Sequence, residues 1–301
     1  RHGDTRRQLL GVEAVLGTGE VVAHLPRVEK DNTGLALASL LCGSEGTLGI
    51  VTAVRLRLVA PPGPRATALV GFSGVAAAVA ASSRLRRTTG IEAVELVLAS
   101  GLALVARVGG PASPLRAAPP VALLVELEDH AEPAARLAEV VAGLAGVVDA
   151  AVATDAPRRA ALWRHREDHT TAIATLGPVH KFDVTLPADE LAGFVEAVPG
   201  LVAGVRPDAA VWLFGHAADG NVHVNVTGLD PADEAVGDVV LAAVVERGGS
   251  ISAEHGIGRA KRRWLHLARS PADLAAMAAI RRALDPDGIC NPAVAFAPTA
   301  P

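Results

Sequence analysis

Tyrosine is absent from this sequence of 301 residues, and aromatic residues make up only 3% of it. Half of the residues are hydrophobic, so the chain can bury a sizeable core, which must be built from aliphatic side chains. Cysteine is scarce as well. The two cysteines, Cys42 and Cys290, fit a reduced cytoplasm better than a disulfide framework.

Strong charge of one sign and long hydrophobic runs are also missing. The formal net charge is −4, and the arginines are balanced by acidic residues, which gives no electrostatic case for nucleic-acid binding. No run of about 18 uncharged apolar residues occurs, and the first residues do not resemble a signal peptide. We therefore expect no transmembrane segment and a cytoplasmic protein, with peripheral membrane attachment as an alternative.

The N-terminal part of the sequence predicts a small β-rich region. Residues 9–16 and 20–25 predict a hairpin, and residues 32–41 predict a short helix capped by Asn32 or Thr33. A glycine-rich loop and an alternating strand follow. Because the sequence opens on such mid-domain character and does not begin with methionine, we expect the chain to be part of a longer protein.

Beyond the linker-like stretch 61–65, which marks the first domain boundary, strand-like and helix-like patterns alternate. Strands are expected at 66–72, 91–98, 121–128, 147–153, 179–186, 209–216 and 221–227. Helices are expected at 74–89, 132–145, 157–175, 188–198, 231–247 and 271–284. This order predicts an α+β fold in which helices cover one face of a mainly antiparallel sheet.

Two histidines flank an Asp-Gly pair in the apolar run FGHAADGNVHVNV, residues 214–226. If Asp219 and Gly220 form a two-residue turn, His216 and His223 lie directly opposite each other, with Cβ atoms roughly 4.5–5.5 Å apart. That spacing suits two imidazoles that bind one cation, although paired structural histidines are the alternative. Asn225 shares the strand face of His223.

A third ligand is available in the stretch GGSISAEHGIGRAKRRWL, residues 248–265. Glu254 and His255 follow a strand-like segment and precede two glycines, and such junctions often carry reactive side chains. Because adjacent residues of an extended chain point in opposite directions, Glu254 can face a metal while His255 faces a substrate. The alternative is that Glu254 stabilises the start of a helix.

Charged residues on one predicted helix and one predicted strand suggest a carboxylate site. Arg166 and Thr170 are separated by one helical turn, and the guanidinium of an arginine matches a carboxylate. Lys181 shares a strand face with Asp183. His165 and His169 are also spaced as metal ligands, but the His-Glu-x-x-His order of metalloproteases is missing. A solvated charged surface is the alternative for all of them.

Four motifs together resemble a known family. The motifs are KDNTGLALASLLCGSEGTLGIVTAVRLRL, HKFDVTLP, GHAADGNVHVNV and GSISAEHGIGRAKRRWL with the later RSP and IRRALDPDGICNP. They resemble the FAD-linked oxidases of the vanillyl-alcohol-oxidase type, and within these the D-2-hydroxy-acid dehydrogenases. The resemblance covers nearly the whole chain, and KDNTG and RSPADLAAM favour the D-2-hydroxyglutarate branch.

The resemblance implies a domain organisation. Residues 1–60 would be the end of an FAD-binding domain whose pyrophosphate-binding half precedes this sequence. Residues 61–270 would be a substrate or cap domain with a mainly antiparallel sheet. Residues 271–301 would be a C-terminal helical segment that packs back on the flavin domain.

The resemblance also implies roles for single residues. The metal ligands would be His216, His223 and Glu254, with zinc as the metal and manganese as the alternative, and His255 would be the catalytic base. The substrate-binding residues would be Arg166, Thr170, Lys181 and Asn225. The flavin-binding residues would be Gly43, Ser44, Glu45, Gly46, Thr47, Gly49, Ile50 and Asn291. Ala218 departs from the family pattern, where a glycine is usual, and CNPAV replaces Asn-Pro-Gly-Lys.

The implied activity is oxidation of a small (R)-2-hydroxy acid, of the D-2-hydroxyglutarate or D-lactate type, to the 2-oxo acid by hydride transfer to FAD. The implied partners are the substrate and an electron acceptor, which would be a quinone, an electron-transfer flavoprotein or a cytochrome, and a homodimer is one compatible assembly. The alternatives are a glycolate oxidase-type subunit, a metal-dependent hydrolase and a non-catalytic fragment that lacks the flavin-anchoring half.

Overall fold

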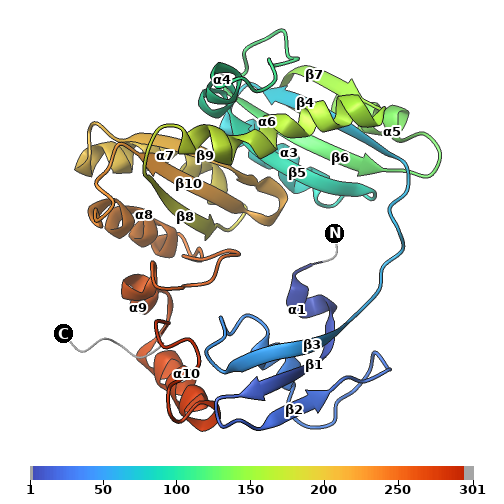
Figure 1. Cartoon of the computed structure of the whole chain (residues 1–301). Helices are drawn as coiled ribbons and strands as arrows, with labels where there is room; N and C mark the ends of the chain where they lie inside the picture. The colour runs from blue at the N-terminus through green and yellow to red at the C-terminus, as the bar shows by residue number, and fades with distance from the viewer. Residues whose placement is uncertain (1–2, 295–301) are drawn as a thin grey trace. The chain divides into compact units, whose positions relative to one another are not determined.

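The computed structural model of the chain describes residues 3–294 (Figure 1). The chain divides into two compact units. Unit 1 consists of residues 1–61 and 254–301, and unit 2 of residues 62–253. Residues 254–270, which were predicted to belong to the second domain, group with unit 1. The assignment of the units to flavin and substrate domains stays a prediction, and residues 295–301 of the expected C-terminal segment lie outside the described residues.

Unit 2 is built on a seven-stranded sheet with the strand order β7-β4-β6-β5-β9-β10-β8 (Figure 1). Every neighbouring pair is antiparallel, which confirms the predicted sheet type. The strands are β4 (Arg65–Phe72), β5 (Ile91–Leu98), β6 (Val121–Glu128), β7 (Val147–Ala153), β8 (Val179–Thr185), β9 (Ala210–His216) and β10 (Asn221–Thr227). All seven lie within two residues of the predicted bounds at each end.

Helices cover both faces of this sheet, so the prediction of a single covered face was wrong. Strands β4 and β6 are buried along nearly their whole length, which requires cover on both sides. One face carries α3 (Val75–Leu85), α5 (Pro133–Ala142), α7 (Leu191–Val205) and α8 (Ala235–Glu246), and α7 contacts both α3 and α8. The other face carries α4 (Ala99–Arg107) and α6 (Ala156–Ala174). No helix or strand was predicted for residues 99–107.

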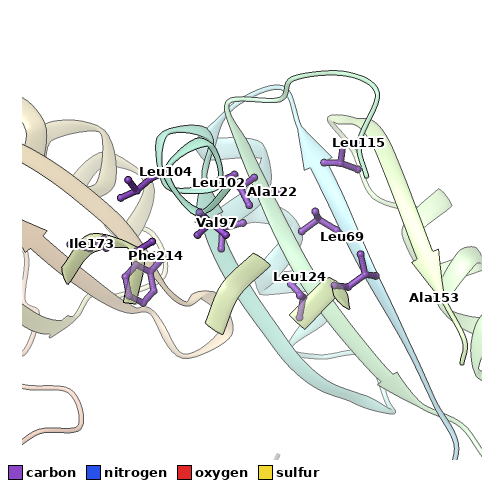
Figure 2. Packing of buried hydrophobic residues seen from close by; sticks show 13 residues of the cluster. Leu69, Val97, Leu102, Leu104, Leu115, Ala122, Leu124, Ala153, Ile173 and Phe214 are labelled. Atoms are coloured by element: carbon purple, nitrogen blue, oxygen red, sulfur yellow. The ribbon is translucent and has the colours of Figure 1, made fainter. Parts of the chain in front are cut away.

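An aliphatic cluster holds α4 and α6 to the sheet, as the absence of tyrosine requires. The cluster joins side chains of the two helices to side chains from five strands, β4, β5, β6, β7 and β9 (Figure 2). Its buried members are Leu69, Val97, Leu102, Leu104, Leu115, Ala122, Leu124, Ala153, Leu162, Ala172, Ile173 and Phe214, with Val105. Full burial of each large side chain contributes roughly 1.5–3 kcal/mol, so this cluster is a main source of the stability of unit 2.

Helix α6 also docks through buried polar contacts. Glu126 of β6 is 6% exposed and accepts hydrogen bonds from Thr67 Oγ1 and Trp163 Nε1, each at 3.0 Å. It also pairs with the guanidinium of Arg65 at 3.0 Å. A buried carboxylate is stable only when it is paired in this way. The sheet-facing side of α6 therefore carries polar residues, which explains why its sequence lacks a clear apolar stripe.

Unit 1 contains a three-stranded antiparallel sheet with the order β2-β1-β3 (Figure 1). Its elements are α1 (Thr5–Gln8), β1 (Leu9–Leu16), β2 (Val21–His24), α2 (Leu37–Leu41), β3 (Gly49–Leu56), α9 (Leu265–Ala268) and α10 (Pro271–Leu284). The predicted hairpin is confirmed. Neither Asn32 nor Thr33 caps α2, whose N-cap is Ala36. Ser270 and Asp273 form a capping box on α10, whose bounds agree with the prediction.

Among residues 3–294, no helix has the length and apolar character that a membrane span requires.

His169 of α6 is buried, with 1% of its surface exposed. Neither of its ring nitrogens has a hydrogen-bond partner among the described residues. Burial lowers the pKa of His169 from 6.5 to about 4, and the positive charge of Arg166 acts in the same direction.

Acid should therefore destabilise the fold through His169. The unfolded chain takes up a proton at this ring as the pH falls below 6.5, whereas the folded chain resists protonation down to about 4. At ~1.4 kcal/mol per pKa unit, the free energy of unfolding should fall by up to about 3 kcal/mol over this interval. Urea unfolding at a series of pH values measures the slope. His169→Gln should make it shallower, and the exposed-site control His130→Gln should not. An unchanged slope in His169→Gln would contradict this account.

Candidate functional site

The hairpin that carries the two histidines has a longer turn than predicted. Residues Ala217–Asp219 form a single 3-10 turn after β9, and Gly220 follows with φ of 71°. His223 consequently pairs with Phe214 across the ladder, so the predicted direct pairing of His216 with His223 was wrong. Gly220 is required here, because a Cβ at this position would lie 2.3 Å from the carbonyl oxygen of Leu186.

The two imidazoles still meet, because the register differs from the predicted one by two residues. A shift of two residues keeps every side chain on its face of the sheet, so His216 and His223 become diagonal rather than direct neighbours. Their ring centroids lie 5.2 Å apart, with the ring planes at 85°. Ala218, where the family pattern has glycine, lies within the 3-10 turn and needs no positive φ.

Glu254 joins the two histidines. It is peptide-bonded to Ala253, the last residue of unit 2, whose N–H donates to the Asp183 carbonyl at 3.1 Å. One ligand atom from each of His216, His223 and Glu254 lies within 4.8 Å of the other two. Within the part of the chain that the structure describes, no other group of histidine, cysteine or acidic side chains converges in this way. Two imidazoles and a carboxylate suit zinc or manganese, so the residues present fit a divalent metal.

Buried carboxylates orient both imidazoles. Glu95 Oε1 lies 2.7 Å from Nδ1 of His216, and Asp183 Oδ1 lies 3.2 Å from Nδ1 of His223. Glu95 is 6% exposed and Asp183 is 2% exposed. A carboxylate at Nδ1 holds the proton on that nitrogen and makes Nε2 the basic one, which is how histidine ligands of metals are commonly arranged.

Helix α6 brings Arg166 to the same face of the sheet. Its Nε donates to Glu95 Oε2 at 2.8 Å, and its guanidinium carbon lies 4.5 Å from the centre of the Phe214 ring. The Phe214 ring is in turn 5.0 Å from that of His223. The guanidinium is therefore held on one edge and one face, which fixes the direction in which it can meet an anion.

The other predicted substrate residues lie on this face or at its border. Lys181 faces Asn225 across the β8–β10 ladder, and Asp183 faces His223 two residues away. Asn225 is 5% exposed, and its side-chain amide donates to the carbonyl of His223 at 3.3 Å. Lys181 is exposed, as is Thr170, one turn beyond Arg166 on α6. The structure thus groups Lys181 and Asn225 with the histidine pair through strand register.

The other candidate histidine pair, His165 and His169, does not form a metal site. Both are buried in α6, and His169 packs on the ring of Phe214 with centroids 5.0 Å apart. No acidic or cysteine ligand joins them among the described residues. They are core residues of the α4–α6 packing layer.

In unit 1, the predicted flavin-binding loop is organised by Glu45. Its carboxylate accepts hydrogen bonds from the backbone N–H groups of Ile257 and Gly258 at 2.8 and 2.7 Å. Its carbonyl accepts one from Asn291 Nδ2 at 2.6 Å. Three distant segments of unit 1 therefore meet at one residue. Gly256 must be glycine, because its φ is 69° and a Cβ there would lie 2.6 Å from Glu45 Cδ.

These contacts limit how the loop can meet a cofactor. The hydroxyl of Thr47 donates to the Ser44 carbonyl at 2.6 Å, so it is used within the loop, as the Glu45 carboxylate is used within unit 1. Gly43 and Gly46 are exposed with positive φ, and Ile50 is 67% exposed. The residues present fit a flavin through exposed backbone and Ile50 rather than through the Glu45 and Thr47 side chains.

His255 follows Glu254 in an irregular, exposed segment of unit 1. The segment continues to Ile257 and Gly258, whose backbone N–H groups donate hydrogen bonds to the Glu45 carboxylate. Glu45 thus holds the chain two residues beyond His255. Glu45, which was predicted to bind the flavin, therefore has a positioning function within unit 1.

Sequence reasoning missed two residues of the site, Glu95 and Asp183. Asp183 was noted only as a neighbour of Lys181 on one strand face. Glu95 stands among apolar residues in the stretch Val94–Val97 of β5, all of which is buried. A lone carboxylate in such a buried stretch requires a cationic or hydrogen-bonding partner, and that requirement was the available signal.

Removal of the Glu45 charge should loosen the segment that follows His255. Glu45→Gln leaves one acceptor oxygen for two backbone donors, so we expect a loss of about 1–3 kcal/mol of stability. Hydrogen exchange should show faster exchange at the amides of Ile257 and Gly258. Glu20→Gln, at an exposed turn of the same unit, is the matched control. Unchanged exchange at these two amides in Glu45→Gln would refute this positioning function.

Comparisons with solved structures agree with the fold. The 4-ethylphenol oxidase of Gulosibacter chungangensis superposes with a TM-score of 0.69 over 96% of this chain and 66% of that one, at 17% identity. p-Cresol methylhydroxylase superposes with a TM-score of 0.65 over 95% of this chain and 64% of that one, at 15% identity. At such identities the likeness shows the fold alone.

Two sequence relatives are more similar. The mitochondrial D-2-hydroxyglutarate dehydrogenase of Rattus norvegicus is 34% identical over 97% of this chain and 56% of its own length. The glycolate oxidase subunit GlcD of Bacillus subtilis is 31% identical over 100% of this chain and 65% of its own length. The chain thus spans little more than half the length of the rat relative. Residues 61–294 match the family described as FAD linked oxidases, C-terminal domain, and the chain belongs to this family.

Proposed function

We propose that the protein containing this chain oxidises a small (R)-2-hydroxy acid, of the D-2-hydroxyglutarate or D-lactate type, to the 2-oxo acid with FAD and a divalent metal. The observation that carries the proposal is the convergence of His216, His223 and Glu254 within 4.8 Å on the sheet face that also bears Arg166. The names of the relatives, a D-2-hydroxyglutarate dehydrogenase and a glycolate oxidase subunit, support the same reaction class. FAD, when bound, supplies the two-electron acceptor.

The residues of unit 2 bind and orient the substrate in this proposal. Arg166 and Lys181 meet a substrate carboxylate, with Thr170 as a hydrogen-bond donor. The Nε edge of Arg166 is held by Glu95, so its Nη atoms are the ones that meet the anion. Asn225 limits the space at the same face from β10. Together these groups select an acidic substrate and fix the orientation of its C2 carbon.

His216, His223 and Glu254 would hold the metal, zinc or alternatively manganese. A divalent cation there would lower the pKa of a hydroxyl group and so favour its deprotonation. His255, the residue after the acidic ligand, accepts the hydroxyl proton and holds it on its imidazole. A quinone, an electron-transfer flavoprotein or a cytochrome is the proposed final acceptor, and a homodimer is the proposed assembly.

The first test is the metal content of the full-length protein. We expect about one divalent ion per chain, and His216→Ala should lose it because two remaining ligands bind a cation poorly. His180→Ala is the matched control, since His180 lies on β8 and its Nε2 contacts the Asp230 carbonyl instead. Elemental analysis after dialysis measures the ion. Full retention of metal in His216→Ala would contradict the site, and an absence of flavin absorbance would favour a metal-dependent hydrolase.

The second test addresses the proton acceptor. His255→Ala in the full-length protein should lower kcat by about 10²–10⁴-fold, the usual contribution of a general base, while flavin and metal contents stay unchanged. His266→Ala is the control, because the His266 ring contacts the Arg263 carbonyl in the same unit. Steady-state turnover of D-2-hydroxyglutarate and D-lactate measures the effect. Near wild-type turnover in His255→Ala, with both groups bound, would rule out this role.

A further inference from the structure

Glu95 lies in the middle of β5 and is 6% exposed, in a strand whose neighbouring side chains are apolar. The burial of an ionised carboxylate is strongly unfavourable unless each oxygen is paired. A hydrophobic residue would fill this position without that penalty, because Val97, two residues along the same strand, already belongs to the aliphatic cluster under α6. The carboxylate is therefore retained for the groups that it contacts.

Each oxygen of Glu95 contacts a different candidate site residue. Oε1 lies 2.7 Å from Nδ1 of His216, and Oε2 accepts from Nε of Arg166 at 2.8 Å. His216 comes from β9 and is the register partner of Glu95, whereas Arg166 comes from α6 above the sheet. One rigid strand thus fixes two side chains from two other elements.

The two contacts have different chemical consequences. At His216, the carboxylate holds the proton on Nδ1 and makes Nε2 the more basic ligand nitrogen. At Arg166, it occupies the Nε edge, while the Phe214 ring supports the guanidinium face at 4.5 Å. The two Nη atoms are then the part of the guanidinium fork directed at a carboxylate.

We propose that Glu95 is a positioning residue that couples the metal ligand His216 to the carboxylate-binding Arg166. This inference rests on the proposed function, since it takes His216 as a metal ligand and Arg166 as a substrate contact. A movement of Glu95 changes both subsites at once. Metal binding and substrate binding are consequently linked through one buried carboxylate, in addition to any contact between the substrate and the metal.

The test compares Glu95→Gln and Glu95→Asp with the matched control Glu126→Gln in the full-length protein. Glu126 is equally buried and also binds a residue of α6, Trp163, but contacts neither His216 nor Arg166 in its hydrogen bonds and ion pairs. Gln keeps the shape of the side chain without its charge. Asp keeps the negative charge that the buried cationic partner requires, so the variant should fold, but its side chain is too short to reach both His216 and Arg166.

Two readouts separate the two contacts. Zinc affinity, measured by chelator competition without substrate, should fall by about 10–100-fold in both Glu95 variants, the usual effect of losing a carboxylate behind a histidine ligand, and stay near wild type in Glu126→Gln. The dissociation constant for D-2-hydroxyglutarate, measured at saturating zinc, should remain raised in the Glu95 variants, because excess metal does not realign Arg166.

Wild-type zinc affinity in both Glu95 variants would overturn the proposal and leave the proposed function intact. Full recovery of D-2-hydroxyglutarate binding at saturating zinc would overturn the coupling to Arg166. If the wild-type protein itself binds no zinc, the metal site fails first and the Glu95 assignment fails with it. An equal loss of zinc affinity and D-2-hydroxyglutarate binding in Glu126→Gln would show that any disturbance of the contact between α6 and the sheet has this effect. That result would also overturn the proposal.

Discussion

The pairing of the buried Glu95 carboxylate with Arg166 of α6 and His216 of β9 is the interaction on which the candidate site depends. Glu126 and Glu95 lie on neighbouring strands, and they bind Trp163 and Arg166 of the helix. Removal of one partner from a buried pair is far more destabilising than replacement of the whole pair by apolar groups. These contacts therefore fix the position of α6 along its axis. The aliphatic cluster supplies most of the free energy that holds the helix on the sheet.

Much of the fold could be predicted because its strands and helices differ in hydrophobic period. The bounds of β5, β6, β7, β10 and α10 agree with the sequence prediction. Cover on the second face of the sheet could not be predicted, because α6 has no clear apolar stripe and α4 follows directly after β5. The polar side of α6 faces buried carboxylates, and periodicity alone treats such a side as solvated.

The candidate site was predictable in its parts and not in its register. His216 and His223 are grouped because strand faces depend on parity, so an error of two residues in the turn left both on one face. Glu95 and Asp183 could not be assigned from spacing, since their partners come from other strands and from α6. Glu45 shows the same limit in unit 1. Its motif predicted a cofactor contact, whereas its carboxylate binds two backbone amides more than two hundred residues later.

The most direct test of the central claim is an X-ray absorption spectrum of the full-length protein at the edge of its bound metal. The account predicts one site of nitrogen and oxygen ligands, with two imidazoles and one carboxylate from His216, His223 and Glu254. A spectrum without imidazole scattering, or a metal bound elsewhere in the protein, would contradict it. The two histidines would then be residues that only support the sheet, and the reaction would have to proceed without a metal at this face.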